Sequence, residues 1–216
     1  MTDTSVLLGA RLTAEQSLSV FRAVLEAVSR PGKVVDLPAG VATSVPPAAV
    51  PVLALADLDV SVATLEAGDG SSPDGERWAS SIRAVTGCRL AAASDADMVV
   101  AIRPPSRVDV DSLRVGTAHA PERGARLFVQ CDAIIEGSTP AGTTIRILGP
   151  GASAGRTITV NGADADVFRA LVAANRGFPA GVDTWLVAGD RRMVGIPRSS
   201  RIDIVAKGGL RGRGTQ

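Results

Sequence analysis

The chain has 216 residues, 45% of them apolar, and a formal net charge of +1. No apolar run approaches the ~20 residues that span a bilayer, and a charge this close to zero gives no reason to expect nucleic-acid or anionic-lipid binding. The first residues, MTDTSVLLG, show no basic segment ahead of the apolar one, so we expect no secretory signal and a cytoplasmic protein.

The N-terminal segment predicts a capped helix. Thr13 and Gln16 form a capping-box pattern, and Pro31-Gly32 ends the helix near Ser29. Apolar residues at helical spacing predict one face that packs against the core: Leu18, Phe21, Leu25 and Val28.

Further elements follow in chain order. Strands are expected at 33–37, 60–65, 97–103, 125–131 and 202–206. Helices are expected at 52–57, after a proline-rich loop at 38–51, at 77–85, after a glycine-rich loop at 68–75, and at 167–174. Asp164 or Asp166 is expected to cap the last helix, and Gly177 to stand at its C′ position. The strands 143–148 and 156–160 look like a hairpin across GPGASAG. The pattern predicts a layered α/β domain with a mixed sheet over residues 1–207 and a disordered basic tail at 208–216.

The stretch FPAGVDTWLVAGDRRMVGIPRSSR, residues 178–201, organises the C-terminal part. Two apolar runs, 182–187 and 193–196, predict a hairpin whose turn has positive φ at Gly189 or Asp190. Pro179 and Pro197 bracket the hairpin, and a cationic, hydroxyl-rich corner, 198–201, follows it. This corner is either a solvated loop or a binding site at a strand end.

The residues offer little for independent catalysis. His119 is the lone histidine, and neither Gly-x-Ser-x-Gly nor Ser-x-x-Lys occurs. Cys88 and Cys131 form no disulfide or metal spacing and are expected in the core. Neither Lys33 nor Lys207 suits a Schiff base, because one follows a Pro-Gly turn and the other borders the tail.

Metal and phosphate patterns are equally weak. The aspartate pairs 57/59 and 95/97 are two residues apart, and we expect them to face solvent or to cap a local turn. The run 149–155 is glycine-rich but lacks the Gly-Lys-Ser/Thr ending of a P-loop and precedes no helix, so we interpret it as a wide turn.

Six segments stand out in order along the chain: FRAVLEAVSRPG (21–32), ALADLDV (54–60), GTAHAPERGA (116–125), LGPG (148–151), FPAGVD (178–183) and IPRSS (196–200). Together they resemble the PhnH family, whose members are subunits of the bacterial carbon–phosphorus (C–P) lyase system. The chain departs from the family pattern across 68–115, has an extra basic tail, and carries Ser199-Ser200 where the family usually has two threonines.

The resemblance implies a three-layer α/β/α sandwich similar to the pyridoxal-phosphate-dependent transferases, but without their cofactor. It implies a homodimer that joins other subunits in a cytoplasmic core complex. That complex acts as alpha-D-ribose 1-methylphosphonate 5-triphosphate synthase: it transfers the ribose triphosphate of ATP onto methylphosphonate and releases adenine. The resemblance assigns no catalytic residue to this subunit, and the residue patterns predict no metal site.

Two groups of residues are candidates for ligand binding. In the first, charge-assisted hydrogen bonds from Arg198 and the hydroxyls of Ser199 and Ser200 would hold a phosphate-bearing ligand. The second group is the loop with His119, Glu122 and Arg123, for which the alternative is a turn stabilised by its own ion pair. Two other functions stay open: an independent pyridoxal-phosphate enzyme that uses Lys33 or Lys207, and a scaffold subunit that touches no substrate.

Overall fold

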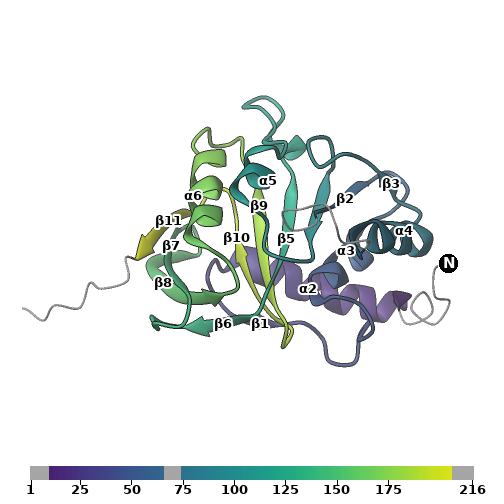
Figure 1. Cartoon of the computed structure of the whole chain (residues 1–216), viewed down its shortest axis with the longest axis horizontal. Coiled ribbons are helices and arrows are strands. Elements are labelled where there is room, and N and C mark those ends of the chain that lie inside the picture. The colour runs from purple at the N-terminus through teal and green to yellow at the C-terminus, as the bar shows by residue number, and fades with distance from the viewer. Residues whose placement is uncertain (1–9, 66–73, 206–216) are drawn as a thin grey trace, which may run out of the picture.

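The computed structural model describes residues 10–65 and 74–205 (Figure 1). The start of the chain, most of the predicted 68–75 loop, Lys207 and the predicted tail lie outside these ranges. No helix in the described ranges has the length and apolarity needed to cross a bilayer. The helical elements are α2 (Ala14–Ser29), η1 (Pro47–Ala49), α3 (Val50–Leu55), α4 (Asp74–Thr86), α5 (Arg107–Asp111), η2 (Pro121–Arg123) and α6 (Ala165–Ala174).

Seven strands form a mixed sheet, which confirms the predicted combination of helices with a mixed sheet. Five neighbouring strands, from β9 to β3, run parallel, and β10 and β1 add two antiparallel pairings at one edge. The order across the sheet is β1 (Val35–Asp36), β10 (Arg192–Ile196), β9 (Asp183–Ala188), β5 (Arg126–Cys131), β4 (Met98–Ala101), β2 (Ser61–Leu65) and β3 (Arg89–Leu90).

A second, antiparallel sheet was not predicted. It contains the expected hairpin, which pairs Ile145 with Ile158, and the last described strand, which pairs Ile202 with Ile147. Its order is β11 (Arg201–Val205), β7 (Thr143–Gly149), β8 (Ala152–Asn161) and β6 (Ala133–Glu136). The short elements β3, β6, α5 and η2 were all missed, and each is six residues or fewer. Segments this short carry too few periods of an apolar pattern to be recognised.

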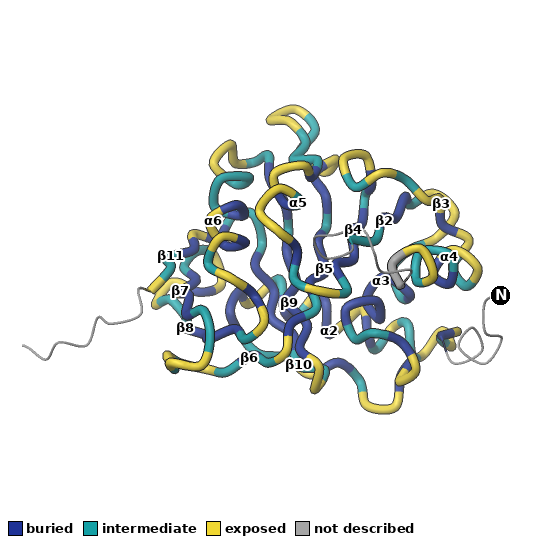
Figure 2. Tube along the Cα trace, in the orientation of Figure 1, coloured by how far each residue is buried: buried dark blue, intermediate teal, exposed yellow. Residues whose placement is uncertain are grey.

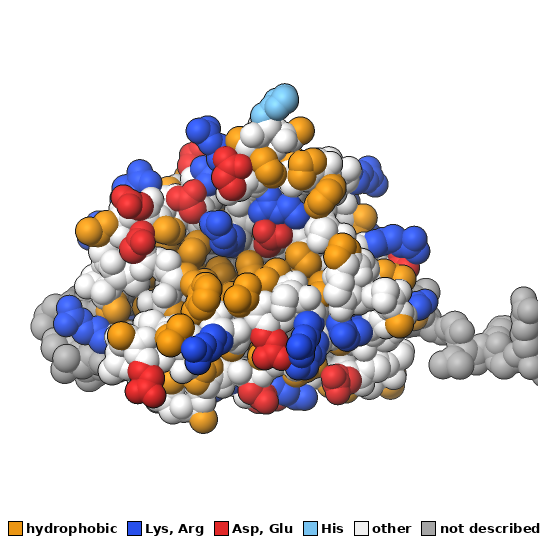
Figure 3. All heavy atoms as spheres, turned by 180° about the vertical axis from the view of Figure 1, so that it is seen from behind, with side chains coloured by type: hydrophobic (Ala, Val, Ile, Leu, Met, Phe, Trp, Pro, Cys, Tyr) orange, Lys and Arg blue, Asp and Glu red, His pale blue; other side chains and the backbone are white. Residues whose placement is uncertain are grey.

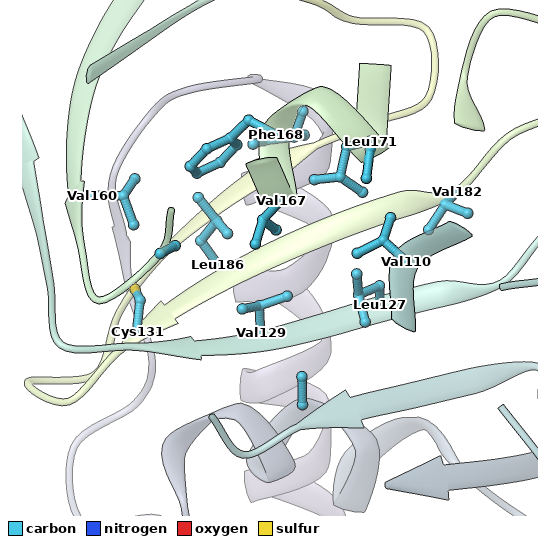
Figure 4. Packing of buried hydrophobic residues seen from close by; sticks show 14 of the residues in the cluster. Val110, Leu127, Val129, Cys131, Val160, Val167, Phe168, Leu171, Val182 and Leu186 are labelled. Carbon is cyan, nitrogen blue, oxygen red and sulfur yellow. The ribbon is translucent and has the colours of Figure 1, made fainter. Parts of the chain in front are cut away.

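Both faces of the mixed sheet are buried (Figure 2). On one face, the rings of Phe128 and Trp185 stack at 4.9 Å, and the Trp185 indole donates to the carbonyl of Val24 in α2 at 3.2 Å. On the opposite face, Leu127 and Leu186 pack with residues of α5, α6 and the second sheet (Figure 4). Burying a side chain of this size contributes about 1.5–3 kcal/mol, so the two clusters hold the layers together.

Helix α2 begins as predicted but presents a different face to the core. The Thr13 hydroxyl accepts from the Gln16 amide at 3.2 Å, and the Gln16 side chain accepts from the Thr13 amide at 2.9 Å. The predicted core face is wrong: Leu18, Phe21 and Leu25 are 47%, 44% and 52% exposed. The buried residues of this helix are instead Val20, Ala23, Val24 and Ala27.

A glycine in the sheet explains the orientation of α2. A Cβ at Gly195 would lie 2.5 Å from the carbonyl carbon and oxygen of Ala27, so only glycine lets the helix approach β10 so closely. The small residues of α2 therefore face the sheet, because they permit the closest contact between the two backbones. The larger apolar side chains point outward.

Three local expectations need correction. The β9–β10 hairpin forms as predicted, but the non-glycine residue with positive φ in its turn is Arg191, at 73°. Gly177 does not have the positive φ expected of a C′ glycine. Asp164 is the N-cap residue of α6, yet its side chain makes no capping hydrogen bond.

Candidate functional site

The C-terminal corner is built around an ion pair. Asp183 opens β9, and Arg198 lies in the turn after β10, where the Ser200 amide donates to the Pro197 carbonyl at 2.8 Å. The Asp183 carboxylate accepts from the Arg198 backbone amide at 2.8 Å, from Nε at 3.1 Å and from Nη2 at 2.7 Å. With the side chains only 13% and 23% exposed, the pair is well shielded from water, which strengthens it.

Arg198 also links the two predicted groups of candidate residues. Its Nη1 donates to the carbonyl oxygen of Pro121, the first residue of η2. A Cβ at Gly124 would lie 2.1 Å from the Gly181 carbonyl oxygen and 2.6 Å from Arg198 Nη1, so this close approach requires glycine. Loops 116–125, 178–183 and 196–200, which are far apart in sequence, therefore meet at one guanidinium.

The exposed side chains of the second group do not form a catalytic arrangement. His119, Glu122 and Arg123 are exposed, and in the described part of the chain none of their side chains has a hydrogen-bond or ion-pair partner. The expected ion pair between Glu122 and Arg123 is therefore absent there. Backbone hydrogen bonds hold the turn instead, including Ala120 to the Thr117 carbonyl at 3.2 Å and Gly124 to the Pro121 carbonyl at 3.0 Å.

A cavity of about 380 Å³ opens beside the Arg198 corner. Ser200 lines it, and its hydroxyl is buried without a hydrogen-bond partner in the described ranges. An unpaired buried hydroxyl is unusual in a folded protein. The full lining is Pro150, Val172, Asn175, Phe178, Arg198, Ser199, Ser200, Arg201 and Ile202.

A second cavity, of about 390 Å³, shares two lining residues with the first, Val172 of α6 and Ile202 of β11. We call the two cavities together the α6–β11 groove. The second cavity adds three arginines, two of which are paired on their own helices: Arg107 with Asp111 at 3.2 Å and Arg169 with Asp166 at 2.5 Å. Arg176 has no side-chain partner among the described residues, so it contributes an unpaired positive charge to the groove.

One side chain that sequence analysis overlooked shapes this groove. Asn175 lines the first cavity at the C-cap of α6. Its Oδ1 accepts from the Val182 amide at 2.7 Å, and its Nδ2 donates to the Val182 carbonyl at 3.3 Å. Asn175 thus fixes loop 178–183 next to the Arg198 corner. The only indication of this role in the sequence was an asparagine that follows a helix. Such an asparagine does not predict a hydrogen bond to Val182, seven residues away.

A second, partly buried network lies at the same edge of the mixed sheet. Asp97 immediately precedes β4, and its carboxylate accepts from the Ser61 amide at 2.9 Å, the Ser61 hydroxyl at 2.6 Å and Arg114 Nη2 at 2.5 Å. Partial burial raises the pKa of Asp97, but the hydrogen bonds from Ser61 and then Arg114 outweigh burial, so the pKa is lowered overall. We had expected Asp97 to face solvent or to cap a local turn. This expectation is wrong, because its carboxylate binds Ser61 and Arg114, which are distant in the sequence.

The remaining chemical candidates offer little reactivity. Cys131 is buried, and burial raises the pKa of its thiol to about 12, with a smaller contribution from Asp132. Cys88 is buried as predicted. The Lys33 ammonium lies 2.5 Å from the Glu26 carboxylate on the surface, not in a pocket suited to a Schiff base. The part of the chain that the structure describes contains no cluster of three or more potential metal ligands.

Comparisons with known proteins matched one family model and one relative. The family model described as "Bacterial phosphonate metabolism protein (PhnH)" matches residues 9–203. A protein from Stutzerimonas stutzeri, described as "Putative C-P lyase subunit protein HtxG", is 28% identical over 192 residues. That alignment covers 88% of this chain and 88% of the relative.

Proposed function

Because the chain belongs to the PhnH family of bacterial phosphonate metabolism proteins, we propose that it is a subunit of a cytoplasmic C–P lyase core complex. Within it, the chain contributes to alpha-D-ribose 1-methylphosphonate 5-triphosphate synthase activity, in which ATP and methylphosphonate react and adenine is released. The similarity of the relative named as a C-P lyase subunit supports this proposal. A fold similar to the pyridoxal-phosphate-dependent transferases, and a homodimer within the complex, are parts of the same proposal.

The observation that carries a ligand-binding role is the convergence of family segments beside the α6–β11 groove. Segments 116–125, 178–183 and 196–200 meet at Arg198, and a Cβ at Gly149, in segment 148–151, would lie 3.2 Å from the Ser199 carbonyl oxygen. Four separate segments thus shape one corner that has a cavity at its side. Loops held this firmly beside a cavity are suited to ligand binding.

We assign different roles to the residues of this corner. The guanidinium of Arg198 has five N–H bonds, and the protein uses three of them. Since Asp183 neutralises its charge, Arg198 mainly positions Ser199 and Ser200, whose hydroxyls donate to a phosphoryl oxygen of the ligand. The unpaired Arg176, farther along the groove, supplies positive charge. The exposed His119, Glu122 and Arg123 contact ligand or another subunit in the assembled complex.

The first test concerns assembly. The chain is tagged in its own host, isolated from cells grown on methylphosphonate as sole phosphorus source, and measured by native mass spectrometry. We expect other phosphonate-pathway subunits to co-purify in defined ratios. A chain that is unaccompanied under these conditions would contradict the proposal.

The second test concerns the groove. In the purified assembly, Ser200→Ala should weaken binding of ATP or methylphosphonate about tenfold, because a neutral hydrogen bond to a charged ligand is lost. Ser94→Ala removes an exposed hydroxyl elsewhere in the chain and should leave binding unchanged. Equal affinity of the Ser200→Ala and wild-type assemblies would exclude the corner from ligand binding and favour a scaffold role.

The independent pyridoxal-phosphate enzyme is the weaker alternative. It requires Lys33, which is ion-paired at the surface, or Lys207. An absorption band of bound cofactor in the pure protein, lost on replacing one of these lysines, would support it.

A further inference from the structure

Helix α2 carries an apolar stripe on the side that faces away from the sheet. Leu18, Phe21 and Leu25 stand at positions i, i+3 and i+7, and all three are among the exposed large hydrophobic residues. Hydrophobic side chains also gather across the middle of the molecular face shown in Figure 3. Apolar residues at the spacing i, i+3 and i+7 form a narrow stripe, here called the seam, along which two helices pair. A helix that packs only on its own sheet has a polar outer side instead.

Two unpaired charges flank the stripe on the same side. Glu15 and Arg22 are exposed, and neither side chain has a hydrogen-bond or ion-pair partner within the described ranges. They are seven residues apart, about 10 Å along the helix axis, on the flank next to the seam. Glu26, by contrast, is already paired with Lys33 at 2.5 Å and is not available.

From this arrangement we propose that α2 is the interface between two copies of this chain, packed antiparallel about a two-fold axis. In an antiparallel pair, each flank faces the same flank of the other helix, so Glu15 of each copy meets Arg22 of the other. In a parallel pair, that flank would face the opposite one, where Ser17 and the buried Val24 lie. Only the antiparallel pair lets one surface satisfy its own charges, as a two-fold interface requires.

The seam supplies the apolar core of this interface. With Leu18 opposite Phe21 of the second copy, the symmetric contact places Phe21 opposite the second Leu18, and Leu25 lies opposite Ala14 at each end. The same register brings Glu15 close to Arg22. The apolar and charged contacts therefore agree on one alignment, and this agreement favours a second copy over an unrelated partner.

The inference rests on the homodimer in the proposed function. Sedimentation of the full chain over a range of concentrations tests separately whether the homodimer forms and whether α2 is its interface. We expect a wild-type dimer and a Phe21→Asp variant whose dissociation constant is at least about thirtyfold higher. Val108→Asp, an equally drastic change at an exposed valine of α5, should leave the dimer unchanged. A wild-type monomer would overturn both homodimer and interface, whereas a Phe21→Asp variant that dimerises normally would overturn the interface alone.

Charge reversal tests the antiparallel geometry at positions too exposed to disturb folding. Glu15→Arg or Arg22→Glu alone should weaken the dimer about tenfold, because each change creates two like-charge contacts. The double variant exchanges the two signs on both helices and should restore wild-type association. Failure of the double variant to recover would refute the antiparallel pairing.

Discussion

The Arg198 corner and the outer face of α2 differ in their exposure to water, and the difference is the reverse of what their residue types suggest. Arg198, a cation in a loop, is shielded from water and bonded to Asp183 and the Pro121 carbonyl. Leu25, an aliphatic residue in an amphipathic helix, is half exposed. Whether a side chain lies inside or outside is decided by the contacts that its segment makes in the fold, since a paired charge can be buried and an apolar residue can remain outside.

This difference separates stability from assembly. The Arg198 corner joins loops of one chain, so damage there should be visible in the unfolding of the isolated protein. About half of each side chain in the α2 stripe is exposed, so changes there should mainly affect association. Substitutions in the two regions should therefore give distinct signatures.

The largest effect should come from Asp183→Ala. This change leaves the shielded guanidinium of Arg198 without its carboxylate and removes three hydrogen bonds. We expect the free energy of unfolding to fall by about 3 kcal/mol, because an unpaired charge would remain in a poorly solvated site. Urea denaturation of the isolated chain measures this loss.

A matched aspartate provides the control. Asp203 pairs with Arg201 at 2.8 Å, but these side chains are 41% and 74% exposed. Asp203→Ala should change the unfolding free energy by less than about 0.5 kcal/mol, as is usual for a solvated pair. Similar losses for the two variants would show that the Asp183–Arg198 pair does not hold the corner together.

Asp97 tests whether the same principle applies along the whole edge of the sheet. Met98, Arg126 and Asp183 stand in register across β4, β5 and β9, so Asp97 and Asp183 lie at one edge. Asp97→Asn should cost about 2 kcal/mol at neutral pH, because the hydrogen bond from Arg114 would lose its ionised acceptor.

The pH dependence of that loss gives an independent check. The folded-state pKa of Asp97 lies below the value of 3.8 of an exposed aspartate, so the unfolded chain takes up its proton first as the pH falls. The stabilisation is complete above about pH 4 to 5 and disappears as the pH falls through the folded-state pKa. The unfolding free energies of wild type and Asp97→Asn should therefore converge in acid, and a constant difference down to pH 2 would contradict this assignment.

Patterns within a few residues of each other predicted the structure well. The Thr13–Gln16 capping box and the β9–β10 hairpin are local, and both form as expected. Helix α5 has a local signal too, since Ser106 and Asp109 form a capping box, but this pattern was overlooked because only five helical residues follow.

Contacts between distant segments were beyond prediction from one sequence. The Arg198–Pro121 hydrogen bond spans 77 residues, and Ser61 meets Asp97 across 36. The second sheet depends on pairing β11 with β7, whose central residues are likewise far apart in the chain. The candidate residues could be named from motifs, but their partners follow from tertiary packing, which no periodicity encodes.

The smallest expected change in stability is that of Leu25→Ala, which we compare with Val24→Ala at the neighbouring position of α2. Val24 is buried and its carbonyl accepts from Trp185, whereas Leu25 is half exposed. In the isolated chain, diluted until it is monomeric, Val24→Ala should lower the unfolding free energy by about 2 kcal/mol through lost burial and a cavity. Leu25→Ala should cost less than about 0.5 kcal/mol, since it exchanges one exposed helix-forming residue for another.

The periodicity of the sequence assigned Leu25 to the core, and on that interpretation the order of the two losses would be reversed. Thermal and urea unfolding of these two variants therefore decides which side of α2 faces the core, and a penalty for Leu25→Ala that appears only as the protein concentration rises would connect this residue to association.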